Sequence, residues 1–110
     1  MVDSFNEVIL LLDFYGGLLT DKQRMIMSYH YEQDMSLSEI SEVLEISRQA
    51  VHDVIKRSEK VLKGYEKELG LVERFNHQKT KLMQIETLLK GNNDESSFKA
   101  LNIIKELINM

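Results

Sequence analysis

No proline occurs anywhere in the 110 residues of this sequence, and only five residues are glycine. Proline interrupts helices because it lacks a backbone N–H group and its ring clashes with the preceding turn. A chain with so few interrupting residues favours long helices over a many-stranded fold, which needs frequent turns. Apolar residues make up 43% of the sequence, which is enough to form a core. We therefore expect an all-α protein of about six helices.

Three capping boxes mark the starts of the first three expected helices. In a capping box, a serine or threonine hydroxyl accepts a hydrogen bond from the backbone N–H three residues later, and a glutamate or glutamine at that position bonds back to the first residue. The boxes are Ser4–Glu7, Thr20–Gln23 and Ser36–Glu39. They predict helices over about residues 5–15, 21–33 and 37–44. We expect Gly16 and Gly17 to end the first of these helices in the left-handed conformation.

Apolar residues recur three or four positions apart along these segments, as they do on the buried side of an amphipathic helix. The side chains expected to face the core are Val8, Ile9, Leu11, Leu12 and Tyr15 in the first helix, Leu19, Met25, Ile26 and Tyr29 at the second, and Leu37, Ile40, Val43 and Leu44 in the third. We also expect His30 and its neighbouring tyrosines to belong to the packing around the second helix.

The segment Leu44–Arg57, "LEISRQAVHDVIKR", places a three-residue turn before a fourth helix. Ser47 can cap this helix, and apolar residues at helical spacing from Val51 predict that it extends to about Leu69. Two helices joined by a short turn, the second capped by serine, are typical of a helix-turn-helix motif, here over about residues 37–57. Five apolar residues have the spacing to hold the two helices together: Ile40, Leu44, Ile46, Val51 and Val54. Ile46 lies inside the turn, so we expect it to be buried against the motif.

The sequence beyond Gly70 predicts two further helices. The fifth is indicated by Leu71, Phe75, Leu82, Ile85 and Leu89, the sixth by Phe98, Leu101, Ile104 and Ile108, and the loop between them by "GNNDESS". We expect a helix-turn-helix domain over residues 1–70 and a C-terminal helical extension over residues 71–110. The apolar seams of the extension can pack on each other, on a second copy of the chain or on a partner protein.

The outward side of the fourth helix carries side chains that suit nucleic acid. Arg48 can bind guanine through two hydrogen bonds, Gln49 can bind adenine, and Lys56 and Arg57 suit phosphates. Ser47 and the N-terminus of the helix can also donate to a phosphate. The candidate nucleic-acid-binding residues are Ser47, Arg48, Gln49, His52, Lys56, Arg57 and Lys60. The alternative is that these polar side chains form an ordinary solvated helix surface.

Charge is unevenly distributed along the chain, whose formal net charge is -4. Residues 1–35 carry six acidic and two basic side chains, whereas the stretch from Arg48 to Lys63 carries five basic side chains against Asp53 and Glu59. Exposed charges are screened over about 8–10 Å at moderate salt, so a local basic surface can act on an acidic protein.

The segment "LTDKQRMIMSYHYEQDMSLSEISEVLEISRQAVHDVIKR" resembles the helix-turn-helix of region four of bacterial sigma factors. The matching positions are Leu19, Arg24, Ser38, Glu39, Ile40, Leu44, Ser47, Ala50, Val51 and Arg57. The chain departs from that pattern in having Ser41 where alanine is usual. Three acids, Glu39, Glu42 and Glu45, also lie on the helix that approaches the DNA backbone, and they oppose tight non-specific binding.

Over nearly the whole chain, including "LLLDFYGGLLTDKQ", the sequence resembles the YlxM family of small helix-turn-helix proteins more closely. That resemblance implies a DNA-binding regulator of transcription that is linked to the signal recognition particle pathway. We expect such a protein to act as a homodimer, because one short helix reads few base pairs.

Two other functions are compatible with the same residues. The cations Arg48, Lys56, Arg57, Lys60 and Lys63 can instead hold the phosphates of a structured RNA in a ribonucleoprotein. The helices after Gly70 can instead form a protein-interaction module that acts on the signal recognition particle GTPase.

The sequence contains no pattern typical of an enzyme, a cofactor site or a metal site. It has no cysteine, and His30, His52 and His77 fall on three different expected helices without ligand spacing. The longest apolar run, Val8–Leu12, is too short to span a bilayer and lacks the basic flank of a secretory signal. We expect a cytoplasmic protein with no membrane partner.

Overall fold

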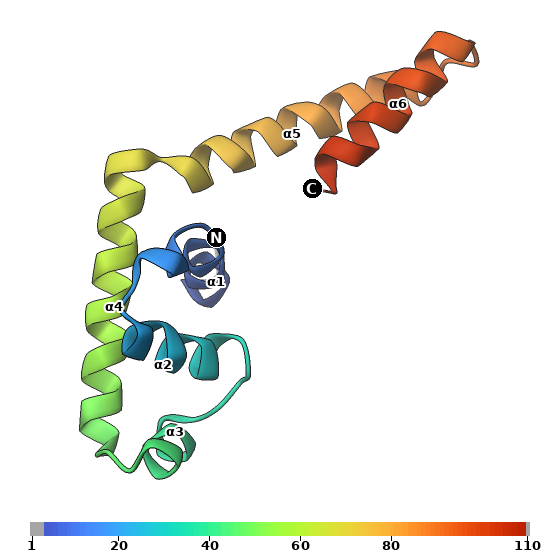
Figure 1. The fold of residues 1–110 in the computed structure, drawn as a ribbon. Helices are drawn as coiled ribbons and strands as arrows, with labels where there is room; N and C mark the ends of the chain where they lie inside the picture. The colour runs from blue at the N-terminus through green and yellow to red at the C-terminus, as the bar shows by residue number, and fades with distance from the viewer. Residues whose placement is uncertain (1–3, 110) are drawn as a thin grey trace. The chain divides into compact units, whose positions relative to one another are not determined.

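The computed structural model describes residues 4–109, and within that range the chain forms six α-helices, one 3-10 helix and no strand. The elements are α1 (Ser4–Tyr15), η1 (Gly16–Leu18), α2 (Asp21–Tyr31), α3 (Leu37–Leu44), α4 (Arg48–Leu69), α5 (Leu71–Leu89) and α6 (Glu95–Ile108) (Figure 1). This confirms the all-α class. The chain divides into two compact parts, an N-terminal unit (Met1–Val72) and a C-terminal unit (Glu73–Met110).

The N-terminal unit is built on α4, the longest of the described helices. Helices α1, α2 and α3 each pack on α4, one after another along its length (Figure 1). The buried apolar residues come from all four helices, from Leu19 before α2 and from the first turn of α5: Val8, Leu11, Leu12, Tyr15, Leu19, Ile26, Met27, Ile40, Val51, Val54, Ile55, Leu62 and Val72. Since α1, α2 and α3 all pack on the same side of α4, the opposite side of α4 is exposed to solvent.

Three of the predicted helix starts have the expected hydrogen bonds. The Thr20 hydroxyl accepts from the Gln23 N–H at 3.2 Å, and the Gln23 side chain accepts from the Thr20 N–H at 3.1 Å. Ser36 and Glu39 form the same reciprocal pair, both at 3.1 Å. Ser47 accepts from the Ala50 N–H at 3.0 Å at the start of α4. The predicted box at Ser4 rests on a side chain that lies outside the described residues.

Two expectations about chain reversals were wrong in detail. Gly16 and Gly17 form the 3-10 helix η1 instead of a left-handed cap, so the first helix continues directly into a tighter turn. Helix α6 begins at Glu95, inside the segment expected to be a loop, since Asp94 already has the extended backbone of an N-cap residue. Gly70 ends α4, and it has a left-handed backbone, with φ +62°.

Several residues expected to face the core are exposed instead. Met25 points to solvent while Met27 is fully buried, because α2 packs against α1 and α3 as well as α4 and therefore buries a different side. Val43 is 59% exposed, since α3 packs through the side that carries Leu37 and Ile40. Leu71, Ile85 and Phe98, expected on the apolar seams of the extension, are also exposed.

The first residues of α5 are fixed to the N-terminal unit by a buried tyrosine. The Tyr15 hydroxyl donates to the Glu66 carboxylate at 2.7 Å and accepts from the Leu71 N–H at 3.1 Å. The same carboxylate accepts from the Val72 N–H at 3.0 Å. The N–H groups of a first helical turn lack partners within the helix. Tyr15 and Glu66 therefore supply the partners for two of them in α5.

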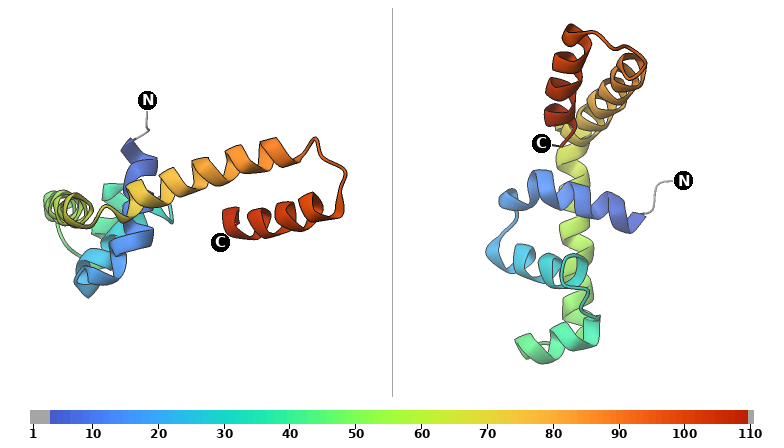
Figure 2. Two further views of the ribbon diagram at one scale, coloured as in Figure 1. Left: turned by 90° about the horizontal axis from the view of Figure 1, so that it is seen from above. Right: turned by 90° about the vertical axis from the view of Figure 1, so that its right-hand side faces the viewer.

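The C-terminal unit consists of α6 and the part of α5 that follows Val72. The two helices run in opposite directions and are joined by the short loop over residues 90–94 (Figure 2). Of the described residues in this unit, Ser97, Leu101 and Ile104 are buried. No helix within residues 4–109 is long and apolar enough to cross a membrane.

Candidate nucleic-acid interface

Helices α3 and α4 are joined by a turn whose geometry depends on Glu45. This residue has a left-handed backbone, with φ 56° and ψ 41°, and its N–H donates to the Ser41 carbonyl. The Ile46 N–H donates to the same carbonyl at 3.2 Å. A left-handed conformation is uncommon for a residue other than glycine and costs about 1 kcal/mol or more. The turn therefore contains no glycine, the residue by which a left-handed position is usually recognised in a sequence.

Ile46 is half-buried and packs against the core of the N-terminal unit together with Leu44. The other motif residues expected to be inward, Ile40, Val51 and Val54, are buried. Packing therefore extends from α3 through the turn into α4, although Ile46 is less enclosed than we expected. Apolar contact on both sides of the turn holds the crossing of the two helices.

Ser47 occupies the N-cap position at the start of α4. Its hydroxyl oxygen accepts from the Ala50 N–H at 3.0 Å, which leaves the hydroxyl proton able to donate to a ligand. The N–H groups of Arg48 and Gln49, in the first turn of α4, have no partner within the helix. This end of α4 has the properties of an anion-binding helix terminus, because unpaired donors and the positive end of the helix dipole coincide.

Every candidate residue named from the sequence is exposed. They extend from Ser47 to Lys60, a rise of about 20 Å along a helix axis. The buried residues of α4 occupy its opposite side: Val51, Val54, Ile55, Ser58 and Leu62. All seven are exposed outside the buried side of α4 and spread over about half of its circumference: Ser47, Arg48, Gln49, His52, Lys56, Arg57 and Lys60, which we call the α4 face. Their role in binding stays a prediction.

Asp53 is the centre of the interactions within the α4 face. Its carboxylate accepts from the Gln49 amide at 2.9 Å and lies 3.7 Å from Nδ1 of His52. Its backbone carbonyl accepts from Nε of Arg57 at 3.4 Å. The sequence identified Asp53 only as an acid within the basic stretch from Arg48 to Lys63 and did not reveal this role. Glutamine and aspartate four residues apart on a helix are the signal that was available.

The cations of the α4 face differ in how far they are held by neighbours. Nζ of Lys56 lies 3.8 Å from the Glu59 carboxylate, which also accepts a hydrogen bond from the Tyr31 hydroxyl. Burial and then this bond to Glu59 raise the pKa of Tyr31. For Arg48 and Lys60 the structure records no hydrogen bond or ion pair with another described residue. These two cations have the fewest competing contacts.

A shallow pocket of about 370 Å³ connects the beginnings of the two motif helices. It is lined by Leu37, the first residue of α3, and by Arg48, Gln49 and His52 of α4. The sequence placed Leu37 in the core, and it is indeed half-buried, but part of it also faces this pocket. The α4 face therefore includes an apolar contact beside its hydrogen-bonding groups.

The acidic residues of α3 differ in how their charge is used. Hydrogen bonds from the backbone N–H and the hydroxyl of Ser36 hold the pKa of the Glu39 carboxyl below its ordinary value. Glu39 therefore serves as part of the capping box of α3. Glu42 and Glu45 are exposed near the turn.

The three histidines do not form a shared site. Nδ1 of His30 lies 3.0 Å from the Met35 carbonyl, within the packing at the end of α2. His52 belongs to the α4 face and His77 to α5. Among residues 4–109 no group of three or more histidine, aspartate or glutamate side chains is arranged to hold a metal ion.

Comparison with known proteins gives a consistent result. Residues 2–102 match the model of a family described as "Putative helix-turn-helix protein, YlxM / p13 like". The UPF0122 protein YlxM of Bacillus subtilis is 45% identical over 91 residues, which cover 83% of this chain and 83% of that protein. A UPF0122 protein of Listeria monocytogenes is 39% identical over 109 residues, covering 97% of this chain and 99% of its own length. Another from Caldanaerobacter subterraneus is 52% identical over 85 residues, covering 77% and 73%.

Proposed function

This chain belongs to the YlxM / p13-like family of helix-turn-helix proteins, and from that membership we propose that its α4 face binds the major groove of double-stranded DNA. The observation that carries the proposal is the placement of all seven candidate side chains on the exposed side of α4. In a helix-turn-helix protein, the second helix lies in the major groove and its N-terminal residues contact base edges. Here those residues are Arg48, Gln49 and His52.

Base reading is assigned to the first two turns of α4. Arg48 has no hydrogen-bond or ion-pair partner among residues 4–109 and can donate two hydrogen bonds to guanine O6 and N7. The Gln49 amide nitrogen donates one of its two N–H groups to Asp53, so the second N–H can donate to adenine N7 and the amide oxygen can accept from adenine N6 or cytosine N4. Leu37, in the same pocket, suits the methyl group of thymine. The proposed site therefore reads a short sequence through a few contacts.

Phosphate binding is assigned to the flanks of this reading region. Lys56, Arg57 and Lys60 follow on the next turns of α4, and Ser47 with the helix N-terminus provides neutral donors at the other end. Three ionic contacts give a slope of about -3 for each bound chain, for the logarithm of the binding constant against that of the salt concentration. Glu42, Glu45 and the net charge of -4 weaken non-specific binding. Specific sites are then favoured over random DNA.

One helix-turn-helix reads only a few base pairs, so the proposal includes a homodimer that binds two half-sites. In this role the protein regulates transcription in the cytoplasm. The link to the signal recognition particle pathway rests on the sequence resemblance alone.

The experiment that tests the proposal is selection of bound sequences from a pool of random DNA duplexes with the full chain, followed by titration of the selected duplex. We expect one enriched motif, a salt slope near -5 for a dimer on two half-sites, and loss of the motif in an Arg48→Ala variant. Lys22→Ala, which removes an exposed cation of α2, serves as the control and should leave the motif unchanged. If selection enriches no sequence and a structured RNA competes for the chain better than any duplex, RNA binding would replace DNA binding as the role of the α4 face. Absence of binding to either nucleic acid would favour protein interaction.

A further inference from the structure

A polar pocket lies in the N-terminal unit where α1, α2 and α4 meet. Its volume of about 320 Å³ falls within the range of about 300–1,000 Å³ that is usual for small-molecule sites. We call it the lysine pocket, and the residues that line it are Phe5 and Val8 of α1, Tyr31 at the end of α2, and Lys56, Glu59 and Lys63 of α4. Of these residues, the proposed DNA contact uses Lys56 alone.

The polar side of the lysine pocket consists of three residues of α4. Lys56, Glu59 and Lys63 are three and four positions apart, so they lie on one side of the helix. Oε1 of Glu59 accepts a hydrogen bond from the Tyr31 hydroxyl, and Oε2 lies 3.8 Å from Nζ of Lys56. The Glu59 side chain is only 16% exposed. Both of its oxygens therefore have partners within the pocket.

The charge of Lys63 is the one that these contacts leave without a partner. Lys63 follows Glu59 by four residues, a spacing at which glutamate and lysine pair on a helix surface. The structure records no hydrogen bond or ion pair between Lys63 and another described residue, since the Glu59 oxygens are engaged by Tyr31 and Lys56. With two lysines and one carboxylate, the pocket has a net charge of +1. This charge favours an anionic ligand.

The apolar side of the pocket comes from α1 and α2. The ring centroids of Phe5 and Tyr31 are 4.9 Å apart, and Val8 is buried in the same lining. Phe5 is 37% exposed, so part of its ring is accessible to a ligand. Burial, and then the bond to Glu59, raises the pKa of Tyr31, so its hydroxyl keeps its proton at neutral pH. The pocket thus places an aromatic surface beside two cations.

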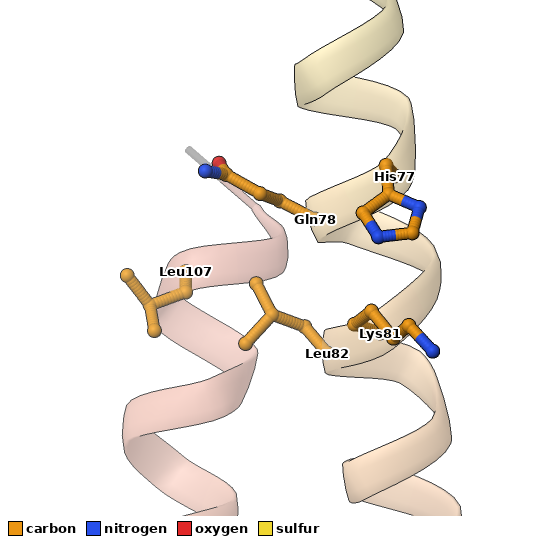
Figure 3. Close-up of a pocket in the computed structure, with 5 residues that line it drawn as sticks. All are labelled: His77, Gln78, Lys81, Leu82 and Leu107. Carbon is orange, nitrogen blue, oxygen red and sulfur yellow. The ribbon is translucent and has the colours of Figure 1, made fainter.

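The groove of the C-terminal unit has a different chemistry. It is lined by His77, Gln78, Lys81, Leu82 and Leu107, and Leu82 extends from α5 toward α6 (Figure 3). One lysine borders this groove, and neither a carboxylate nor an aromatic ring of phenylalanine or tyrosine lines it. The combination of paired lysines and an aromatic wall belongs to the lysine pocket and not to this groove.

We propose that the lysine pocket binds a nucleoside monophosphate. A phosphate monoester carries a charge of about -1.5 to -2 near neutral pH, which Lys56 and Lys63 can neutralise. Lysine binds phosphate as a point charge and does not need the fixed geometry of arginine. The base can stack on Phe5, because every base has a face that stacks on an aromatic ring. A carboxylate has about four acceptor positions, so Glu59 can accept from a sugar hydroxyl and keep its present contacts.

A free nucleotide suits this pocket better than the backbone of a duplex, because the bases of a duplex are stacked on each other and cannot reach Phe5. The inference goes beyond the proposed function and does not depend on it. Its evidence lies in Phe5, Tyr31, Glu59 and Lys63, which are not among the residues of the α4 face. Nucleotide binding is measured without DNA, so failure of one proposal leaves the other standing.

Isothermal titration calorimetry of the full chain with adenosine, guanosine, cytidine and uridine monophosphates, each alone, tests the proposal. We expect at least one of them to bind about tenfold more tightly than inorganic phosphate or the matching nucleoside, because it contacts both sides of the pocket. Lys63→Ala should weaken this binding about tenfold, with an unchanged helical circular dichroism spectrum. Lys67→Ala is the matched control, since Lys67 is an exposed lysine of α4 outside the pocket. It should leave the affinity unchanged.

Glu59→Gln is a second variant whose expected effect has the opposite sign. The glutamine oxygen can still accept from Tyr31, while repulsion between the carboxylate and the bound phosphate is removed. We expect the nucleotide to bind about fivefold more tightly. Damage to the fold would weaken binding in both variants, so a gain in Glu59→Gln beside a loss in Lys63→Ala supports a phosphate in the pocket.

Three results would overturn the proposal. The first is that none of the nucleotides binds at concentrations up to about 10 mM. The second is an equal affinity of the wild-type chain and Lys63→Ala, and the third is an equal affinity for the nucleotide and for inorganic phosphate. If no nucleotide binds and Lys63→Ala lowers the salt slope of duplex binding by about 1 for each bound chain, the phosphate at Lys63 belongs to the DNA backbone instead.

Discussion

The side-chain amide of Gln49 donates a 2.9 Å hydrogen bond to the carboxylate of Asp53, one turn further along α4. The same carboxylate lies 3.7 Å from Nδ1 of His52, so two proposed reading residues share one acidic partner before any ligand binds. This arrangement fixes the orientation of the Gln49 amide. It also places a negative charge among the cations of the α4 face.

Neutralising Asp53 is therefore expected to strengthen DNA binding. In Asp53→Asn, a side-chain oxygen is still present to accept from Gln49, while the repulsion between one carboxylate and nearby phosphates is removed. A charge interaction at a few ångströms in water is worth about 1 kcal/mol, so we expect an increase in affinity of about fivefold in a fluorescence anisotropy titration. Asp13→Asn, an exposed change on α1, is the control. A weaker complex would mean that the charge of Asp53 itself is needed for binding.

The two arginines at the ends of the α4 face are expected to have different roles. Arg48→Ala should cost about 1–3 kcal/mol and relax the preference at one base pair, because it removes a contact to a base edge. Arg57→Ala should weaken binding equally for all sequences and reduce the salt slope by about 1 for each bound chain. Titrations of a selected and a random duplex at several salt concentrations measure both effects. An identical response of the two variants would contradict the assignment of reading and phosphate binding to different turns.

The contact made by Ile46 predicts a difference in stability between two neighbouring residues. Ile46 is half-buried against the core, whereas Val43 is 59% exposed on α3. We expect Ile46→Ala to lower the free energy of unfolding by about 1–2 kcal/mol, below the range for a fully buried isoleucine. Val43→Ala should change it by less than about 0.5 kcal/mol. Urea unfolding followed by circular dichroism measures both, and equal losses would show that the turn is not packed as described.

The capping box of α3 predicts a dependence of stability on pH. Hydrogen bonds from Ser36 lower the pKa of Glu39, so the carboxylate form is favoured in the folded chain. This contribution is fully present above the ordinary glutamate pKa of about 4.3 and is lost as the pH falls through the lower value of the folded state. An NMR titration of the Glu39 carboxyl should give a pKa that rises in Ser36→Ala. An unchanged pKa of Glu39 in that variant would show that the Ser36 hydroxyl does not lower it.

Helix starts and the main outline of the motif could be predicted from the sequence because they depend on local interactions. The hydrogen bonds at Thr20, Ser36 and Ser47 each join residues three positions apart. Buried sides were harder to predict, because they depend on which neighbouring helices pack on each element. Met25 and Val43 were misplaced for this reason: periodicity identifies an apolar stripe but not its exact edges.

The candidate interface was predicted in composition but not in its internal contacts. The exposure of the α4 face follows from the helical period of its buried residues. The left-handed backbone of Glu45 could not be predicted, since neither glycine nor asparagine marks the position. The part of Leu37 that faces the pocket was missed as well, because it depends on how α3 lies against α4.

The most direct test of the central claim is an NMR titration of the isotopically labelled full chain with a selected DNA duplex. The claim that the α4 face enters the major groove predicts the largest chemical shift changes at the backbone amides of Ser47–Lys60 and at the side chains of Arg48 and Gln49. Changes that avoid α4 and gather on other helices, or none at duplex concentrations that saturate the complex, would contradict it.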